Sequence, residues 1–521
     1  QIDPCYCYSA PGLTWECGLK YTGIELELLT DYDMLLMFEK GIRGGYSGVL
    51  GDRYVKANNK YLEDYDTEKD SNYLLYLDAN NLYGWAMSQK LPTNDFKKEE
   101  DLNYYKDIPE GRGCIIECDL EYSHMSKYKL SNFPLAPEKL SINEEDLNQN
   151  YQGIILEKEN KKIGKTEKLI LNLNSKEKYV INYKLLEYYE SLGLKVTKVH
   201  RIISFKESDW LKKYIDFNTK QRTLATTDFE KDLWKLMNNS FYGKTLENIR
   251  GKIKFELYSN EEKAKKEFSK PNFNNRIIFN ENLVGVLNNV PSINFNKPIY
   301  LGMNILDYSK LLMYKFYYEN INMLWPRNQI IGYDTDSFFL NIYTEDVYKD
   351  LEKIKEDLDT SDYPQNHPLH STENKKVIGK FKDELNGKIM KEIVFLRSKA
   401  YSYKIEEKEQ KKLKGITRAV VNKLTFEDYK KCLFQNPNEY KIRCDKMYQL
   451  NSVRHEMYIK EISKKSLSPY DDKRYILDDG IKTIPHSDYN DRLLLEIMQD
   501  MPRQNITTFI MLNILQNMQL T

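Results

Sequence analysis

Two carboxylates separated by a single residue, Asp334 and Asp336, interrupt an otherwise apolar stretch at residues 330–340. Apolar and β-branched residues lie on both sides of them, which predicts two short buried strands joined by a tight turn. Carboxylates at the tip of a buried hairpin are costly unless an opposite charge neutralises them, and hard divalent cations prefer oxygen ligands of this kind. The alternative is an ordinary solvated turn, because Asp favours turns.

A third carboxylate, Asp78, has a similar local setting. The apolar run at residues 73–77 predicts a buried strand, and Asp78 follows at its end, before a turn and a helix. An Asp at this place can bind a metal ion, while the N–H groups of residues 79–83 can hold phosphate oxygens. Tyr83 would then face the sugar that carries those phosphates. The alternative is an Asp that only caps the helix.

A cation, an amide and an aromatic side chain share one face of a predicted helix. Lys235, Asn239 and Tyr242 are spaced four and three residues apart, so they lie in one row. Such a row can bind a phosphate, a base edge and the face of a sugar or base. A solvated helix face is the alternative.

The elements that must position these residues are also visible. Residues 208–223 and 227–244 predict an antiparallel helical hairpin, and Thr227 with Glu230 fits a capping box at the start of the second helix. The buried side of that helix is predicted to contain Phe229, Leu233, Leu236 and Met237. On the first helix, Lys213, Lys220 and Arg222 add positive charge.

Further elements flank this hairpin. Residues 30–41 predict a helix capped by Thr30, and the loop Arg43-Gly44-Gly45 follows, where the backbone can approach a ligand. Helices are also predicted at 182–193 and 308–318, and strands at 113–120, 168–173 and 195–204. The turn pair Asn386-Gly387 predicts a hairpin of residues 377–385 and 388–396, followed by a strand that contains Lys399 and Tyr401.

Composition sets broad limits. The chain has 521 residues, with Lys+Arg and Asp+Glu equal at 78 each, so it lacks the basic excess of a protein that simply coats nucleic acid. Neutrality still allows a nucleic-acid enzyme, because an acidic metal site and basic grooves can cancel. The seven cysteines show no repeated pair spacing, which indicates a reducing compartment; a zinc site at Cys5, Cys7 and Cys17 is a weak alternative. No apolar run reaches membrane-spanning length.

Taken together and in this order, the separate pieces resemble the motifs of family B DNA polymerases. The family forms DxxSLYP, KxxxNSxYG, YxDTDS and KxY are similar to DANNLYG (78–84), KLMNNSFYG (235–243), GYDTDS (332–337) and KAY (399–401). The amino-acid sequence around these motifs is most similar to the protein-primed branch, and within it to polymerases of Maverick/Polinton-type transposons and related viruses. The stretches that carry this closer resemblance are 77–92, 133–140, 229–248, 297–316, 374–387 and 471–480.

The chain departs from the family pattern in three places. Asn81 and Gly84 replace the Ser and Pro of the first motif, and Ile42 replaces the Tyr of the YxGG loop that the segment at 42–45 resembles. The family also has a 3′–5′ exonuclease domain before this region, and no segment here precedes residue 1 to hold its carboxylates. We therefore expect no proofreading from this chain.

The resemblance implies nucleotidyl transfer with two Mg²⁺ ions, or Mn²⁺ as an alternative. Asp78 and Asp336 would hold the ions with help from Asp334. The incoming nucleotide would be bound by Lys235, with Lys220 or Arg222, by Tyr83 stacking on its sugar and excluding a ribose 2′-hydroxyl, and by Asn239 and Tyr242 beside the nascent base pair. Primer and DNA contacts would come from Lys399, Tyr401, Arg43, Gly44 and Gly45.

The implied fold is an α+β right-hand polymerase with palm, fingers and thumb and the two insertions of the protein-primed branch. The expected divisions are 1–70 (connecting region), 71–130 (first part of the palm), 131–204 (insertion), 205–248 (fingers), 249–300 (second insertion), 301–405 (second part of the palm) and 406–521 (thumb and tail).

The implied partners are a DNA primer–template, dNTPs and a terminal priming protein, with no membrane and a monomeric state. The expected location is intracellular, with the nucleus as one candidate. Two other functions remain open. One is a catalytically inactive, DNA-binding remnant of such a polymerase. The other is a metal-dependent glycosyltransferase that uses Asp334 and Asp336 on a sugar nucleotide, which leaves Asp78 and the Lys235 helix without a role.

Overall fold

A six-stranded sheet lies at the centre of the computed structural model, which describes residues 2–164, 166–453, 456–487 and 489–499. Its order is β1-β13-β14-β3-β16-β15, and all neighbours are antiparallel except β15 and β16. The strands of this central sheet are β1 (Ser47–Val49), β3 (Asn72–Ala79), β13 (Asn328–Asp334), β14 (Ser337–Tyr343), β15 (Leu358–Asp359) and β16 (Phe381–Asp383). The two predicted acidic segments therefore meet in one layer.

The central sheet is covered on both faces, which explains the near-continuous apolar sequences of β3 and β14. Leu75 and Leu77 belong to the main core, together with residues of the almost wholly buried helix α10 (Ile299–Lys315). Leu74 and Phe339 belong to a second core, which a four-stranded sheet completes. That sheet has the order β19-β18-β17-β2, with β2 (Tyr54–Lys56), β17 (Met390–Arg397), β18 (Ala400–Ile405) and β19 (Lys408–Leu413).

A third sheet carries the region between residues 91 and 208. Its order is β4-β9-β5-β8, with β4 (Leu91–Glu99), β5 (Arg112–Tyr122), β8 (Lys176–Asn182) and β9 (Leu194–Ser208). Helix α6 (Tyr183–Ser191) packs against this sheet, and α2 (Tyr32–Gly41) contacts β8 and α10. The predicted helix 182–193 is confirmed, with Asn182 as its cap. Strand β5 pairs with β9 along most of its length. Segments on both sides of the expected division at residues 130 and 131 therefore belong to one sheet.

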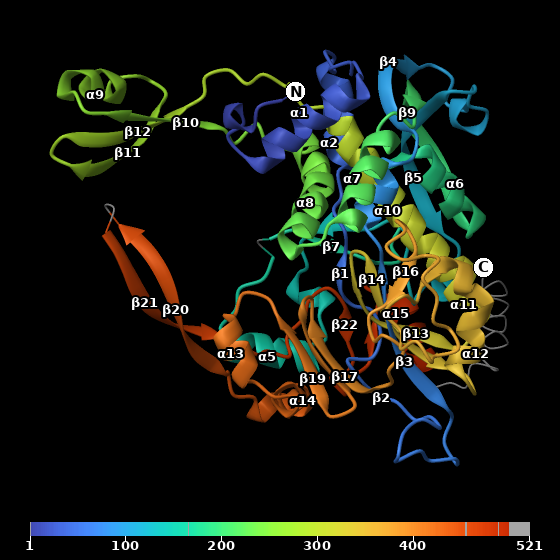
Figure 1. Ribbon diagram of the computed structural model, residues 1–521. Helices are drawn as coiled ribbons and strands as arrows, with labels where there is room; N and C mark the ends of the chain where they lie inside the picture. The colour runs from blue at the N-terminus through green and yellow to red at the C-terminus, as the bar shows by residue number, and fades with distance from the viewer. Residues whose placement is uncertain (1, 165, 454–455, 488, 500–521) are drawn as a thin grey trace.

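The predicted helical hairpin is present as α7 (Lys212–Leu224) and α8 (Asp228–Thr245), which lie above the central sheet in the view of Figure 1. Thr227 and Glu230 form the predicted capping box. The predicted buried side was wrong in part, because Phe229 is 76% exposed and Leu236 is 43% exposed. Helix α1 (Ala10–Thr22) packs on α8, and the buried residues of α8 are Met237 and several residues after it.

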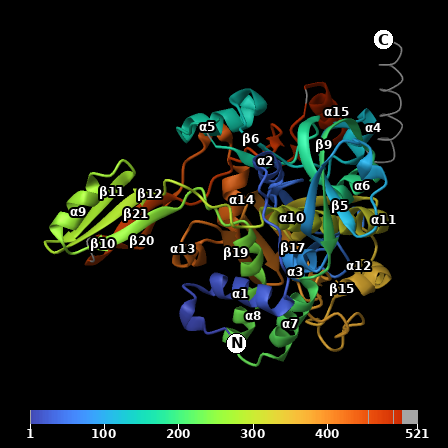
Figure 2. The ribbon, with the colours of Figure 1, turned by 90° about the horizontal axis from the view of Figure 1, so that it is seen from above.

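Two arms project from the same side of the body in both views (Figures 1 and 2). One consists of β10 (Ile253–Tyr258), α9 (Glu261–Phe268), β11 (Phe273–Asn280) and β12 (Leu283–Asn289). The other is the long hairpin of β20 (Cys444–Val453) and β21 (Glu456–Lys465), which the sequence analysis did not anticipate.

Short elements complete the fold. They are α3 (Leu82–Met87), α4 (His124–Lys129), α5 (Ile154–Lys158), α11 (Asn322–Leu324), α12 (Val347–Leu351), α13 (Arg418–Lys423), α14 (Phe426–Phe434) and α15 (Tyr489–Gln499), with strands β6 (Glu138–Leu140), β7 (Lys168–Ile170), β22 (Tyr475–Ile476) and β23 (Thr483–Ile484). Across the described ranges, the helices are too short or too polar to cross a bilayer.

Two local predictions were wrong. Asp31, and not Thr30, caps helix α2, because its Oδ1 accepts hydrogen bonds from Asp33 N at 2.9 Å and Met34 N at 3.1 Å. The Asn386-Gly387 turn does not join a β-hairpin, because β16 and β17 belong to different sheets. Instead the Asp383 carboxylate accepts the amides of Leu385 and Gly387, and the chain leaves the central sheet at that turn.

Candidate active site

Strand pairing in the central sheet brings two of the predicted carboxylates together. Asp78 is opposite Ser337 in the β3–β14 ladder, and Ala79 N donates a hydrogen bond to Asp336 O at 2.7 Å. Both carboxylates line a cleft of about 430 Å³, and Lys235 and Asn239 of α8 line it as well. The strand ends and the helical row that were predicted separately therefore face a common space.

Asp78 lies in surroundings that disfavour its negative charge. Burial raises the pKa of Asp78, and the neighbouring charges of Asp336 and Glu384 raise it further. Lys235 and Lys382 act in the opposite direction but do not cancel these effects. A carboxyl perturbed by burial and by like charge inside a cleft is typical of a functional site that binds a cation.

Asp336 is perturbed in the same direction. Burial raises its pKa first, and the negative charge of Asp334 adds to this effect. A backbone hydrogen bond and the cations Lys399 and Lys235 oppose the shift. The two cleft carboxylates therefore share excess negative charge at the same sheet edge.

Asp334 is held differently from the other two. Its Oδ1 lies 3.2 Å from Lys399 Nζ, and this ion pair lacks hydrogen-bond geometry, so Oδ1 is buried without a hydrogen-bond partner. Its backbone oxygen accepts the Asp336 amide at 2.7 Å, which closes the tight turn. Asp78 and Asp336 line the cleft, whereas Asp334 is not among its lining residues.

The donor set fits Mg²⁺ as a partly built site. Within the described ranges, no three His, Cys, Asp or Glu side chains gather closely enough to hold a metal ion by themselves. Mg²⁺ is commonly bound by one or two carboxylates, waters and substrate phosphates and seldom by an all-protein cage. Asp78 and Asp336 supply the two carboxylates, and both are destabilised as anions without a cation.

The turn after Asp78 is fixed by neighbouring backbone. Ala79 N binds Asp336 O, and Asn80 N donates to Lys380 O at 2.8 Å. Asn81 has a φ of 45°, and its side chain accepts the Gly84 amide at 3.2 Å. The amides of Ala79 and Asn80, two of the five predicted to hold phosphate, are thus already hydrogen-bonded to neighbouring backbone. The amides that remain for phosphate binding are those of residues 81–83.

Two tyrosines from different helices meet at the cleft. The rings of Tyr83 on α3 and Tyr242 on α8 stack with centroids 4.4 Å apart and planes inclined by 13°. Tyr83 lines the cleft itself. Burial raises the pKa values of both phenols, so the pair is neutral at physiological pH. The stack joins the end of the palm-like strand β3 to the helical hairpin.

The cations of α7 differ in position. Arg222 lines the cleft, and its buried Nε has no hydrogen-bond partner. Lys220 is exposed and does not line the cleft. Of the two alternatives suggested by sequence, the structure places Arg222 beside Lys235.

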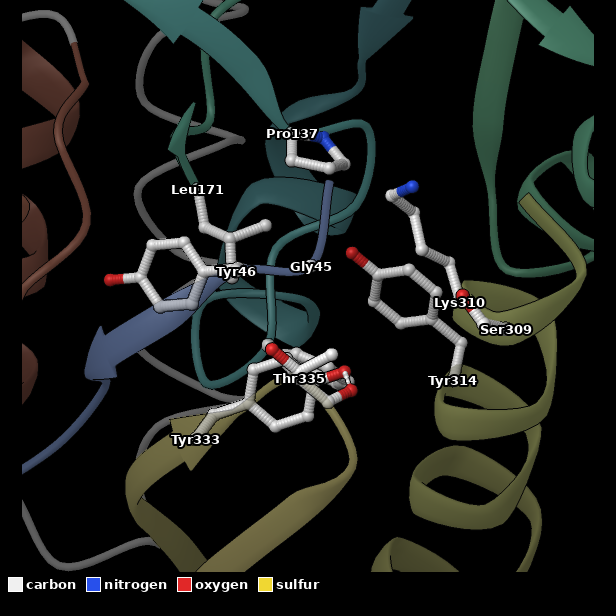
Figure 3. A pocket seen from close by; sticks show the side chains of 10 residues that line it. Gly45, Tyr46, Pro137, Leu171, Ser309, Lys310, Tyr314, Tyr333 and Thr335 are labelled. Atoms are coloured by element: carbon white, nitrogen blue, oxygen red, sulfur yellow. Dashed lines mark hydrogen bonds between the residues drawn. The ribbon is translucent and has the colours of Figure 1, made fainter. Parts of the chain in front are cut away.

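The Arg43-Gly44-Gly45 loop lies between helix α10 and the acidic hairpin. Figure 3 shows Gly45, Thr335 at the hairpin tip and Lys310 on α10 around one small pocket. The buried Lys310 Nζ donates to Arg43 O at 2.7 Å, and Thr335 N donates to Tyr46 O at 2.8 Å. The loop therefore connects α10 to the turn that separates Asp334 from Asp336.

The side chain of Arg43 points into the protein. Its guanidinium lies 3.6 Å from the centroid of the Tyr179 ring and donates to Val180 O at 2.7 Å. Arg43 is buried and supports the loop, and direct contact of Arg43 with DNA stays a prediction. Tyr401 is likewise a core residue, stacked on Phe395, whereas Lys399 is partly exposed beside Asp334.

Sequence reasoning missed one wall of the cleft. This wall consists of Asp359, Ser361, Asp362, Lys375, Lys376, Lys382 and Glu384. The available signal was the concentration of charged residues at 380–384, where Lys382 falls opposite Asp78 across the β16–β3 pair. The sequence analysis assigned this segment to a hairpin that does not form.

Comparison with known proteins gives structural matches alone. No protein-family model matches the chain, and no curated protein sequence matches it either. Two matching crystal structures are phi29 DNA polymerase complexed with primer-template DNA and incoming nucleotide substrates (TM-score 0.50, 17% identity) and phi29 DNA polymerase in an orthorhombic crystal form (TM-score 0.51, 16% identity). Each alignment covers 88% of this chain and 68% of the phi29 chain. At these identities the likeness concerns the fold: the chain has the α+β right-hand architecture of a polymerase, with palm, fingers and thumb.

Proposed function

We propose that this chain is a DNA-directed DNA polymerase that adds deoxynucleotides to a primer 3′ end. The observation that carries the proposal is that Asp78 and Asp336 lie together at the ends of the paired strands β3 and β14, and line one cleft with Lys235, within a polymerase fold. Each feature was predicted from a different sequence motif, and their convergence is what nucleotidyl transfer requires. The phi29 structure that includes primer-template DNA and nucleotides supports the same substrate class.

The residues that line the cleft have separate roles in the proposed reaction. Asp78 and Asp336 would hold two Mg²⁺ ions, which lower the pKa of the primer hydroxyl and neutralise the departing pyrophosphate when bound. Lys235 and Arg222 bring positive charge to the triphosphate side. Asn239 lines the same space and can contact the nascent base pair. The protein mainly contributes position and charge, as expected for phosphoryl transfer.

The geometry disfavours the glycosyltransferase alternative. Such an enzyme would use both carboxylates of the Asp334-Thr335-Asp336 turn on one sugar nucleotide. Here Asp336 lines the cleft, whereas Asp334 pairs with Lys399 and does not. The alternative also leaves the Lys235 row without a function. An inactive remnant would keep the fold and bind DNA but would not extend a primer.

A direct test offers the purified chain two substrate pairs in parallel reactions with Mg²⁺. One reaction contains a primer–template and the four dNTPs, and the other contains sugar nucleotides and a sugar acceptor. We expect primer extension that requires the template and no sugar transfer. Sugar transfer, or no extension by a folded chain that binds DNA, would contradict the proposal.

The biological setting that we propose is protein-primed replication of a mobile element or virus-like DNA, with a terminal protein as partner. Support comes from the sequence resemblance to transposon polymerases, which also implies that the segments 131–204 and 249–300 are the two insertions of the protein-primed branch. A priming reaction in which the first dNMP is joined to a candidate terminal protein would test this setting.

Tyr83 is predicted to select against ribonucleotides. Its ring lines the cleft and is fixed by the stack on Tyr242, so a 2′-hydroxyl would meet a rigid aromatic surface. We expect Tyr83→Val to increase rNTP incorporation relative to dNTP by about 10- to 100-fold, the range that one steric contact provides. Single-nucleotide incorporation with matched rNTP and dNTP measures the ratio. Tyr6→Val, at a residue 90% exposed, should leave the ratio unchanged.

Gly45 is predicted to set the position of the acidic turn. A Cβ at residue 45 would lie 2.5 Å from Thr335 Cγ2, so Gly45→Ala must displace the turn between Asp334 and Asp336. Because small misplacements of catalytic groups are costly, we expect incorporation to slow by about 10- to 100-fold. Gly12→Ala is the control, since a Cβ there meets only Ser9 Oγ, at an ordinary contact distance of 3.6 Å. Equal activity of the two variants would show that the loop does not position the site.

A further inference from the structure

We propose that Lys376 is an additional cation for the triphosphate of the incoming nucleotide, and that Asp359 is the positioning residue that fixes the Lys376 loop beside the strand carrying Asp78. The inference rests on the proposed polymerase function and deepens it. It concerns Lys375 and Lys376, the two residues of the segment 374–380 that line the cleft, to which the resemblance assigns no role. Four observations support it.

The loop is joined to the catalytic strand by reciprocal backbone hydrogen bonds. Gly379 N donates to Asn80 O at 2.8 Å, and Asn80 N donates to Lys380 O at 2.8 Å. Gly379 has a φ of 80°, and a Cβ there would lie 2.4 Å from the Trp85 ring on α3. The segment 374–380 is therefore fixed directly beside Asn80, which follows the end of β3 at Ala79 and lies two residues after Asp78.

Asp359 links the same two segments through its side chain. Its Oδ2 accepts hydrogen bonds from Asn80 Nδ2 at 2.8 Å and from Lys376 N at 2.9 Å, and its Oδ1 accepts Ser361 N at 3.1 Å. Burial acts to raise the pKa of Asp359, but these hydrogen bonds hold it below its usual value. Because its oxygens are already engaged with these donors, Asp359 acts as a positioning group and leaves the nearby lysine charge unmatched.

Lys376 has a strained backbone, which is consistent with a functional role. Its φ is 58°, a left-handed value that costs a residue with a side chain free energy and persists only when the surroundings enforce it. Here the hydrogen bond from its own amide to Asp359 enforces it. Strain of this kind clusters at ligand-binding sites.

The ammonium of Lys376 adds to a cluster of like charges. Lys376 lines the cleft with Arg222 and Lys235, which belong to the fingers helices α7 and α8. Burial lowers the pKa of Lys376, and the positive charges of Arg222, Lys375 and Lys231 lower it further; the negative charge of Asp362 opposes this shift but does not cancel it. In the described part of the chain, no carboxylate lies within ion-pair distance of Lys376. An anion bound between the two walls would relieve this repulsion.

Two neighbouring lysines show the contrast. Lys380 is paired with Asp357 at 3.2 Å, and Lys382 is paired with Asp362 at 2.8 Å. Lys376 is thus the unpaired lysine among these three. A nucleoside triphosphate carries several negative charges in a row, and the cations of the fingers and Lys376 would contact it from two parts of the chain.

The test compares Lys376→Met with Lys376→Arg and with the matched control Lys380→Met. For single-nucleotide incorporation on a primer–template, we expect Lys376→Met to raise KM for dNTP about 10- to 30-fold with little change in kcat. Lys376→Arg should restore KM to within about threefold, and Lys380→Met should leave it unchanged. An unchanged KM in Lys376→Met would overturn the inference while leaving the polymerase function intact.

A second measurement separates this inference from the proposed function. Tripolyphosphate should raise the Tm of the parent and of Lys380→Met, and it should raise that of Lys376→Met much less. If the parent does not extend primers, the polymerase proposal fails, and this comparison alone decides whether Lys376 binds the phosphate chain. Equal shifts in all three proteins would overturn the inference.

The role of Asp359 is tested by coupling. Asp359→Ala removes both side-chain oxygens, including the acceptor of the Lys376 amide, and should raise KM for dNTP. The double variant Asp359→Ala/Lys376→Met should be no worse than Lys376→Met alone. Additive effects would show that Asp359 acts on the fold and not through Lys376.

Discussion

Asp336→Asn is expected to reduce primer extension by at least about a thousandfold, because it removes one of the two carboxylates that would hold the catalytic metal ions. Asp78→Asn should have a similar effect, since both residues line the cleft at the same sheet edge. Rapid-quench incorporation of one nucleotide measures the loss. Asp357→Asn, which alters a carboxylate paired with Lys380 outside the cleft, should retain nearly full activity.

The same variants should also differ without any turnover. Mg²⁺ with a bound dNTP should raise the Tm of the parent, because a ligand that binds the folded state stabilises it. The shift should be lost in Asp336→Asn, while the metal-free variant is at least as stable as the parent, since an unfavourable buried charge is gone. A variant that is simply unfolded would fail this second criterion, so the two readouts separate a lost site from a lost fold.

Arg53→Met is expected to destabilise the protein by about 3–5 kcal/mol, because three buried carbonyl oxygens lose a hydrogen bond from a charged donor, while the desolvation cost of the guanidinium is also removed. Arg53 is fully buried, and its guanidinium donates to Gly480 O at 3.1 Å and Leu396 O at 2.8 Å, and also to Pro469 O. It therefore joins the segment before β2 to the end of β17 and to the C-terminal part of the chain. Its loss leaves three carbonyl groups without this donor.

Thermal denaturation followed by circular dichroism measures this effect. We expect the Tm of Arg53→Met to fall by about 3–5 °C, and Arg276→Met, at an exposed position of the β11 strand, to change it little. A change in Arg53→Met as small as in the control would show that these contacts of Arg53 with β17 and the C-terminal segment do not stabilise the fold.

Features set by neighbouring residues were predictable from sequence. The capping box of Thr227 and Glu230 and the row of Lys235, Asn239 and Tyr242 depend on one helix and on its period of 3.6 residues. The strand ends at Asp78 and Asp336 follow from local apolar runs in the same way. Their adjacency depends on the pairing of β3 with β14, and only the resemblance to known polymerases suggested it.

Features decided by distant contacts were not predictable. Whether the Arg43 side chain points to solvent or onto Tyr179 depends on where strand β8 packs. The residues next to Arg43 in the sequence give no information about that packing. Asn386-Gly387 does turn the chain, but strand β17 pairs with β2 and β18 instead of β16. The lysines of the 374–382 region look alike in sequence, and only the positions of Asp357 and Asp362 separate the paired from the unpaired ones.

Templated incorporation by the parent beside Asp336→Asn tests the central claim most directly. Each protein is given Mg²⁺, a primer on one of four templates that differ in the next base, and each dNTP in turn. We predict that the parent adds only the complementary nucleotide and that Asp336→Asn adds none. Extension that survives in Asp336→Asn would contradict the assignment of the metal site. No addition by a folded parent that binds the primer–template would contradict the polymerase function itself.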